Sequence, residues 1–444
     1  ELGLVVWQDF MYACASYELD DAFEANITQE TIENVRRIRH HACLGLWCGN
    51  NEIETQIEFW KTSEKQKYDY IKLYEYIIPK IVKEEDPNAF YWPSSPSSGG
   101  NFENSWSEDQ GDMHYWDVWH GNKPFTEYRK FHFRYLSEFG FQSFPSLKTV
   151  ESFTLPEDRN IFSRVMEMHQ RNRAANGKIL NYLSATYLYP KDFDHLLYAS
   201  QLLQADAIRY GVEHFRRYRG RCMGTVVWQL NDIWPVASWA SIDYYGRWKA
   251  LHYAEKKMFA PVMISCEETG ELSERPFCIQ EPAPIEKSAR LHVANETMEE
   301  VTGTVSWSLR RPDSSILEEG SQKVTVPALD GVWLEKMDFG AYEEREIHLT
   351  YSFSVDGQVV SENSCLFTAP KHYFFADPKL RCERKGDQII VHADAYAKNV
   401  EIIAEDGDLW LSDNFFDMEA GEYAVSIIRG DAKSVTCRSV FDIA

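Results

Sequence analysis

The chain has 444 residues, of which 44% are hydrophobic and 26% charged, and its formal net charge at pH 7 is −23. A chain of this length exceeds one ordinary compact domain, and its composition is that of a globular protein and not of a disordered one. The strong negative charge disfavours nucleic acid and anionic membranes as partners, and no apolar stretch is long enough to span a bilayer. Neither kind of partner is therefore expected.

Up to about residue 258, short apolar runs alternate with helical patterns. The runs are Leu2–Trp7, Ala42–Trp47, Ala89–Trp92, Tyr135–Leu136 continuing to Phe139, and Met223–Leu230. They lack polar–apolar alternation, which is typical of parallel strands buried on both faces. Apolar residues with helical spacing occupy 32–38, 70–81 and a segment near 197–218. Alternating strands and helices predict a parallel sheet, closed as a barrel or doubly wound.

Beyond about residue 260 the pattern becomes that of alternating strands, and no helical pattern is seen. Examples are Ala289–Ala294, Val301–Leu309, Ile347–Val355 and Gln388–Ala393, and the turn pairs Asp356-Gly357 and Gly386-Asp387 suit tight hairpins. The spacing predicts antiparallel, immunoglobulin-like β-sandwiches with a join near Pro370. The expected domains are therefore an α/β domain over 1–258 and two sandwiches over 259–370 and 371–444.

The cysteines favour free thiols over a disulfide framework. There are nine, an odd number, at Cys14, Cys43, Cys48, Cys222, Cys266, Cys278, Cys365, Cys382 and Cys437. None forms a CxxC pair or a metal-like spacing with histidine, and several lie inside apolar runs. Reduced thiols favour a reducing compartment, so a cytoplasmic location is slightly favoured. No phosphate loop, GxSxG turn, nicotinamide fingerprint or metal cluster is seen, so no cofactor and no metal are expected.

Two glutamates stand where an apolar run ends. Glu52 follows the run Ala42–Trp47, and Glu138 comes at the end of the run that begins at Tyr135. Most glutamates are solvated surface charges, but the carboxyl ends of barrel strands form the active face of a (β/α)₈ barrel. Retaining glycosidases need two carboxyl groups roughly 5–5.5 Å apart, one as nucleophile and one as acid/base. These two glutamates are the candidate pair.

Several motifs around this pair resemble glycoside hydrolase family 2, and in particular its β-mannosidases. They are Trp7-Gln8-Asp9-Phe10, Trp47-Cys48-Gly49-Asn50-Asn51-Glu52, Gly111-Asp112-Met113-His114-Tyr115-Trp116, Trp119-His120-Gly121, Ser137-Glu138-Phe139-Gly140-Phe141-Gln142-Ser143 and Trp228-Gln229-Leu230-Asn231-Asp232-Ile233-Trp234-Pro235. The resemblance covers the chain to about residue 258, and the order of the sandwiches agrees with it. It implies a TIM-type (β/α)₈ barrel followed by two sandwiches.

The resemblance also implies roles for single residues. Glu52 would be the acid/base and Glu138 the nucleophile, and Asn51 would contact the sugar hydroxyl at carbon 2. Trp228 would form the floor beneath the −1 sugar. The pocket would also be lined by His114, Trp116 and His120, although a structural role for the two histidines stays open. The implied substrate is a β-mannoside glycoside or oligosaccharide with a terminal, non-reducing β-D-mannose.

The resemblance is to a longer protein. Members of the family have two domains before the barrel, and Leu2–Phe10 resembles barrel strand three. The sequence is thus expected to be a C-terminal fragment that lacks the first two barrel strands. Its expected partner is the N-terminal half of the same protein, without which this chain would be poorly active.

Two alternatives remain open from the sequence. One is another family 2 specificity, such as β-galactosidase, β-glucuronidase or exo-glucosaminidase, because part of the segment that reads the axial 2-hydroxyl of mannose would be missing. The other is a non-catalytic carbohydrate-binding protein built on a degenerate barrel. The presence of both Glu52 and Glu138 in their motifs disfavours the second alternative.

Overall fold

A computed structural model describes residues 2–275 and 284–444, so Cys278 lies outside the described residues. The chain divides into two compact units, each described here by itself. The first comprises residues 1–115, 131–139 and 221–226, and the second comprises 116–130, 140–220 and 227–444. The predicted domain limits at 258 and 370 stay a prediction.

The first unit contains the strands of the barrel portion. One parallel sheet has the order β1 (Val6–Asp9), β2 (Leu44–Cys48), β3 (Phe90–Trp92), with Trp47 paired to Gln8 and to Tyr91. A second sheet has the order β4 (Met113–His114), β5 (Leu136–Phe139), β6 (Thr225–Val227), and β4 and β5 are parallel. Each predicted apolar run overlaps a strand, and β1 and β2 extend beyond the ends of their runs. The expected fold class, an α/β barrel portion followed by two immunoglobulin-like sandwiches, is confirmed.

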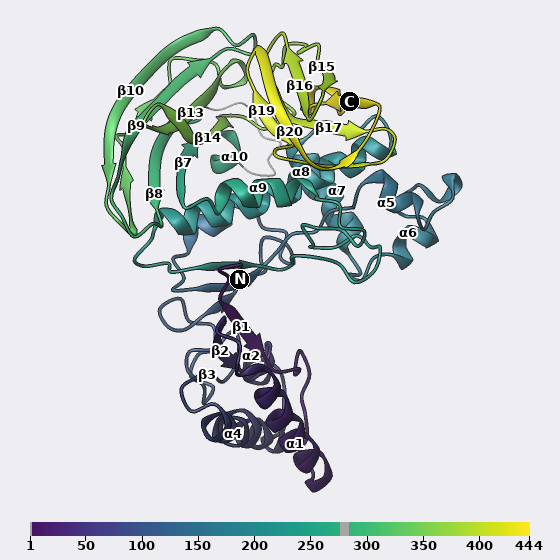
Figure 1. Ribbon diagram of the computed structural model, residues 1–444, viewed down its shortest axis with the longest axis vertical. Helices are drawn as coiled ribbons and strands as arrows, with labels where there is room; N and C mark the ends of the chain where they lie inside the picture. The colour runs from purple at the N-terminus through teal and green to yellow at the C-terminus, as the bar shows by residue number, and fades with distance from the viewer. Residues whose placement is uncertain (1, 276–283) are drawn as a thin grey trace. The chain divides into compact units, whose positions relative to one another are not determined.

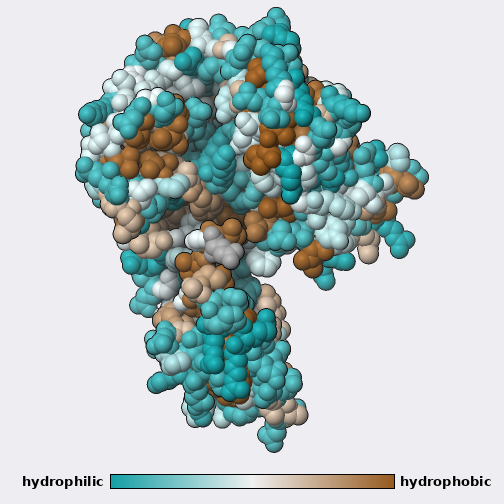
Figure 2. Space-filling model, viewed as in Figure 1, coloured by the Kyte–Doolittle hydropathy of each residue, from teal (hydrophilic) through white to brown (hydrophobic). Residues whose placement is uncertain are grey.

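Helices pack on the first sheet of this unit (Figure 1). They are α1 (Asp21–Ile38), α2 (Ile53–Phe59), α3 (Glu64–Tyr70), the π-helix η1 (Ile71–Ile77) and α4 (Ile78–Glu85). The helical spacing over 70–81 is confirmed, because α3, η1 and α4 follow one another without a break. Their apolar side joins a core that includes Phe10, Trp47, Leu73 and Ile78. The outer surface here is mostly hydrophilic (Figure 2), as expected of amphipathic helices.

This core gives a testable stability prediction. Ile78 is fully buried in it, so Ile78→Ala is expected to lower the free energy of unfolding by about 2–5 kcal/mol through lost burial and the cavity left behind. Urea denaturation measures the change. Lys80→Ala, an exposed position in the same helix, is the matched control, and equal effects of the two substitutions would contradict the placement of Ile78.

The second unit begins with helices. They are the 3₁₀ segments η2 (Phe125–Lys130) and η3 (Pro156–Asp158), and the α-helices α5 (Leu147–Glu151), α6 (Arg164–Met168), α7 (Ala175–Thr186), α8 (Phe193–Arg217) and α9 (Ala250–Met258). The helix predicted near 197–218 is α8, whose N-cap Asp192 accepts a hydrogen bond from the His195 amide at 2.9 Å. Most of α8 is buried, which explains why its sequence contains so few charged residues at its centre.

Two antiparallel sandwiches complete the second unit (Figure 1). The first pairs the sheet β10-β9-β13-β14 with a sheet formed by β11, β8, β12 and β7. Its strands are β7 (Val262–Thr269), β8 (Ser288–Asn295), β9 (Val301–Arg310), β10 (Ile316–Val326), β11 (Asp330–Trp333), β12 (Met337–Asp338), β13 (His348–Val355) and β14 (Gln358–Leu366). Asp356 and Gly357, both at positive φ, form the predicted tight hairpin between β13 and β14.

The second sandwich pairs the sheet β15-β16-β20-β18 with the sheet β19-β17-β21. Its strands are β15 (Arg381–Lys385), β16 (Gln388–Ala393), β17 (Ala397–Ala404), β18 (Asp408–Leu411), β19 (Phe416–Met418), β20 (Gly421–Asp431) and β21 (Val435–Arg438). The expectation of no helix beyond residue 260 is wrong in detail. The short helix α10 (Glu271–Glu274) and two 3₁₀ turns, η4 (Glu344–Glu346) and η5 (Val440–Asp442), occur there, because a single turn is too short to produce a periodic pattern.

The eight cysteines in the described ranges are all free thiols. Cys48, Cys222 and Cys266 are buried, whereas Cys14 and Cys43 are exposed, so only part of the set behaves as core residues. Among the helices of residues 2–275 and 284–444, none has the length and apolar character needed to cross a membrane.

Candidate active site

The turn after β2 fixes the backbone around Glu52. Gly49 lies so close to the next strand that a Cβ atom there would be 2.3 Å from the Pro93 carbonyl oxygen, so only glycine fits. The buried Asn50 donates to that carbonyl at 3.0 Å, and its Oδ1 accepts from the Ile53 amide at 3.0 Å. Glu52 itself has φ 64°, a left-handed conformation, directly before α2 begins. The turn thus sets where the Glu52 side chain emerges.

Glu138 is brought to the same place by strand pairing. It lies on β5, in register with His114 on the parallel strand β4, and its carbonyl oxygen accepts from the Tyr115 amide at 2.9 Å. Residues in register on neighbouring strands project their side chains to the same side of a sheet. The carboxylate of Glu138 and the imidazole of His114 are therefore neighbours.

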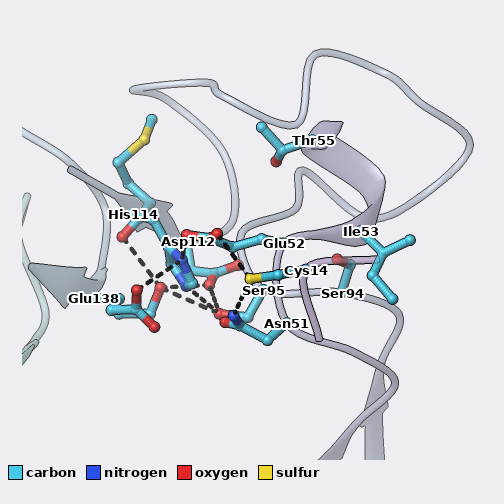
Figure 3. Close-up of polar contacts among 12 residues, drawn as sticks. Cys14, Asn51, Glu52, Ile53, Thr55, Ser94, Ser95, Asp112, His114 and Glu138 are labelled. Carbon is cyan, nitrogen blue, oxygen red and sulfur yellow. Dashed lines mark hydrogen bonds and ion pairs between the residues drawn. The ribbon is translucent and has the colours of Figure 1, made fainter. Parts of the chain in front are cut away.

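The His114 imidazole lies between the two carboxylates (Figure 3). Its Nδ1 is 2.8 Å from Oε1 of Glu52 and 3.6 Å from Oε1 of Glu138. One oxygen of each carboxylate and one imidazole nitrogen all lie within 4.8 Å of one another. These three residues therefore form one cluster, in which the side chain of His114 is buried and those of the glutamates are partly exposed.

The charges around His114 favour its protonated form. Burial alone would lower the pKa of this histidine, but the negative charges of Glu138, Glu52 and Asp112 and the hydrogen bond to Glu52 outweigh it, so the pKa is raised. An imidazolium placed here supplies the positive charge that two neighbouring carboxylates require. The same three side chains have the composition of a metal cluster, but a protonated imidazole already offsets part of the negative charge of the pair, and we do not propose a metal there.

A buried hydrogen-bond network orients His114 through Nε2, the second nitrogen of its ring. Asp112 accepts hydrogen bonds from Trp92 Nε1 at 2.8 Å and from the hydroxyls of Ser95 and Ser137 at 2.6 Å each. Since Ser95 gives its proton to Asp112, its oxygen acts as acceptor for His114 Nε2 at 2.9 Å. This arrangement places a proton on Nε2 and turns Nδ1 toward the carboxylates.

The sequence did not identify Asp112, Ser95 or Cys14 as parts of this site. Asp112 and His114 are two residues apart, which puts their side chains on one side of a short strand, and this spacing was the available signal for Asp112. Ser95 and Cys14 come from other loops and gave no signal. Cys14 Sγ lies 3.4 Å from Oε2 of Glu52 and 3.5 Å from Nδ2 of Asn51.

The predicted site residues fall in both compact units. Glu52, Glu138, Asn51 and His114 belong to the first unit and lie together there. The remaining three belong to the second: Trp116, His120 and Trp228. Within that unit the rings of Trp116 and His120 have centroids 5.0 Å apart, and a Cβ atom on Gly140 would meet both Trp116 and the Trp228 carbonyl. That these three line the sugar pocket stays a prediction.

A cavity is also present in the second unit. It measures about 730 Å³ and lies between the two sandwiches, where Figure 2 shows a hydrophilic recess. Two of its carboxylates already have cationic or imidazole partners, Asp417 with Lys398 at 3.2 Å and Glu419 with His348 at 2.7 Å. Because these two carboxylates already have partners in the second unit, the candidate active site is placed at Glu52 and Glu138 and not at this cavity.

Comparisons with known proteins identify relatives of the chain. Residues 287–372 match the model of a Mannosidase Ig/CBM-like domain, and residues 375–443 match that of an Ig-fold domain. Beta-mannosidase B of Thermothelomyces thermophilus is 29% identical over 98% of this chain and 54% of its own length. Beta-mannosidase B of Aspergillus terreus is 31% identical over 82% of this chain and 45% of its own length.

Solved structures agree with these matches. The β-D-mannosidase from Dictyoglomus thermophilum superposes with a TM-score of 0.86 at 26% identity, over 99% of this chain and 53% of that chain. An exo-chitosanase from Amycolatopsis orientalis, with a TM-score of 0.64 at 12% identity over 95% of this chain and 53% of that chain, shares the fold alone. The chain spans about half the length of the relatives it matches. The resemblance carried by the barrel motifs is thus confirmed, and over nearly its whole length this chain is similar to proteins named β-mannosidase.

Proposed function

We propose that the protein is a retaining exo-glycosidase that removes terminal, non-reducing β-D-mannose, with Glu138 as nucleophile and Glu52 as acid/base. The observation that carries the proposal is the pair of carboxylates held on either side of His114 Nδ1, with one oxygen of each within 4.8 Å. Inverting enzymes keep their carboxyl groups roughly 6.5–9.5 Å apart to leave room for a water molecule. The close approach of one oxygen from each carboxylate is what supports a double displacement here.

The two steps assign a separate task to each carboxylate. In the first step Glu138 attacks the anomeric carbon while Glu52 gives a proton to the departing glycosidic oxygen, which leaves mannose bound covalently to Glu138. In the second step Glu52 takes a proton from water, whose oxygen attacks the same carbon and releases Glu138. Because each step inverts the anomeric centre, the product keeps the β configuration.

Residues around the pair serve this chemistry through charge and orientation. The positive imidazolium of His114 contacts both carboxylates and limits their repulsion before substrate binds. Asn51, adjacent to Glu52, is proposed to hydrogen-bond the 2-hydroxyl of the sugar. Trp116, His120 and Trp228 are proposed to line the pocket, with the Trp228 indole, which is 45% exposed, beneath the −1 sugar.

Mannose is proposed as the sugar because the curated relatives are named β-mannosidases. Other family 2 specificities, namely β-galactosidase, β-glucuronidase and exo-glucosaminidase, are the alternatives. The rest of the family's polypeptide, N-terminal to this chain, is proposed as the partner needed for full activity. A non-catalytic carbohydrate-binding role is a less favoured alternative, since it would not require two carboxylates so close together.

A panel of p-nitrophenyl glycosides tests the proposal on the complete protein. Release of nitrophenol from the β-mannoside, and much less from the β-galactoside, β-glucuronide and β-glucosaminide, is the expected result. If another glycoside is cleaved instead, the roles proposed for Glu52 and Glu138 stand and the proposed sugar specificity is wrong. If the complete protein binds mannosides but cleaves none of the panel, the hydrolase proposal is wrong and the binding role replaces it.

A further inference from the structure

The loop over residues 97–106, which follows β3, has an unusual backbone. Gly99, Gly100, Asn101 and Phe102 have φ values of 121°, 99°, 62° and 56°, and Asn104 has φ 54°. Positive φ is easy for glycine but costs free energy at residues with a Cβ atom. A loop with so many such residues needs contacts outside itself to hold one conformation.

Three glutamates provide those contacts by accepting hydrogen bonds from the loop backbone. Glu54 Oε1 accepts from the Phe102 amide at 3.1 Å, Glu58 Oε2 from the Ser105 amide at 2.9 Å, and Glu75 Oε1 from the Asn101 amide at 2.6 Å. Glu54 and Glu58 lie on α2, and Glu75 lies on η1. These three residues are called the glutamate clamp.

Glu54 is the most buried member of the clamp, with none of its surface exposed. Burial raises its pKa to about 7, and the like charges of Glu75 and Glu58 add to this, while hydrogen bonds from Ser97 and the Phe102 amide offset part of it. Burial raises the pKa of the Tyr70 phenol, and the charge of Glu54 adds to that rise. A solvated surface carboxylate would have none of these features.

The loop makes hydrogen bonds both to α2, the helix that follows Glu52, and to the segment around β4, the strand that carries His114. Next to α2, Thr55 Oγ1 and Ser105 Oγ lie 3.0 Å apart. At its other side the Ser97 amide donates to Asp112 Oδ1 at 3.0 Å, and Trp106 Nε1 donates to the His114 carbonyl at 3.2 Å. A displacement of the loop would therefore move His114 and its support, Asp112, relative to the two carboxylates.

We propose that Glu54, Glu58 and Glu75 are positioning residues that hold the loop 97–106 and, through it, keep His114 aligned between Glu52 and Glu138. The effect of this clamp on catalysis rests on the proposed hydrolase function, whereas its effect on the loop does not. None of the three is proposed to touch substrate. The expected signature is a loop that opens, and a site that loses alignment, when an acceptor of the clamp is removed.

Amide hydrogen exchange of the complete protein tests the clamp without reference to activity. Glu54→Ala removes the acceptor for Phe102 and is expected to speed exchange in peptides covering 97–106 at least tenfold. Glu54→Gln keeps an acceptor oxygen and is expected to restore protection. Glu84→Ala, at an exposed glutamate of α4, is the control and is expected to leave the exchange unchanged. If Glu54→Ala does not fold, Glu75→Ala, at the less buried end of the clamp, replaces it.

The pH dependence of the same exchange separates the clamp from ordinary packing. The pKa of Glu54 in the folded protein, about 7, lies above the roughly 4.3 of a solvated glutamate. Its contribution to loop closure is therefore fully present below about pH 4.3, where the side chain is protonated in either state, and is lost as the pH rises through 7. After correction for intrinsic exchange, loop opening is expected to rise roughly tenfold from pH 6 to pH 8 in the wild type. In Glu54→Gln it is expected to stay flat.

Kinetics with an aryl β-mannoside complete the test. Glu54→Ala is expected to lower kcat at least tenfold with a smaller change in KM, and Glu54→Gln to recover most of the loss. Unchanged exchange and unchanged kcat in a folded Glu54→Ala protein would overturn the proposal. If the wild type hydrolyses no glycoside, the proposed function fails, and the exchange data alone still decide whether the clamp holds the loop.

Discussion

Replacing Glu138 by alanine is expected to lower kcat/KM for an aryl β-mannoside by roughly 10⁴–10⁶-fold, because the group that forms the covalent bond is lost. The loss should be equally large for good and poor leaving groups, since no leaving group can depart at a useful rate without an attacking nucleophile. Steady-state kinetics of the complete protein with a series of substituted phenyl β-mannosides measures it.

Azide gives this prediction a stereochemical readout. In Glu138→Ala the removed carboxylate leaves room on the α face, where azide can attack the anomeric carbon directly. The expected product is α-mannosyl azide, in which the configuration is inverted once. Glu151→Ala, an exposed glutamate on α5, is the control and should keep wild-type activity without azide. Retention of activity in Glu138→Ala would contradict the assignment of the nucleophile.

Sequence patterns predicted the architecture where long-range contacts were not needed. The strand β2 was visible because it is a continuous apolar run, and α8 because its apolar residues recur with helical spacing. The two-residue strand β4 was not visible as a run, because its pairing partner β5 and not its own composition makes it a strand. The π-helical segment η1 was missed for a similar reason, since its sequence has ordinary α-helical spacing.

The candidate site was predictable in part. Glu52 and Glu138 each end an apolar run, so the position of each could be inferred from its own neighbourhood. Asp112 and Ser95 contact each other and His114 only when the segment after β3 is folded against β4, so their place in the site is not visible in the sequence alone. Glu54 is harder still, because α2 is too short for its burial to be inferred from periodicity. Local sequence thus indicates the proposed reacting groups better than the residues that hold them in place.

Replacing Glu52 by alanine is expected to affect substrates unequally, in contrast to Glu138→Ala. General acid–base catalysis contributes roughly 10²–10⁴-fold, and this factor should be lost in full for an alcohol leaving group such as a second sugar. A dinitrophenyl β-mannoside needs no proton on its leaving group, so its first step should remain fast. Its second step loses the base that activates water, so a burst of dinitrophenol followed by slow turnover is expected.

Azide also distinguishes the role of Glu52 from that of Glu138. In Glu52→Ala the covalent intermediate on Glu138 still forms, and azide, which needs no general base, should attack it from the β face and raise the turnover. The expected product is β-mannosyl azide, whose configuration is retained after two inversions. Formation of the β azide here and of the α azide in Glu138→Ala requires a nucleophile at 138 and an acid/base at 52. The same azide from both variants, or equal losses for all leaving groups in Glu52→Ala, would contradict these roles even if both residues proved essential.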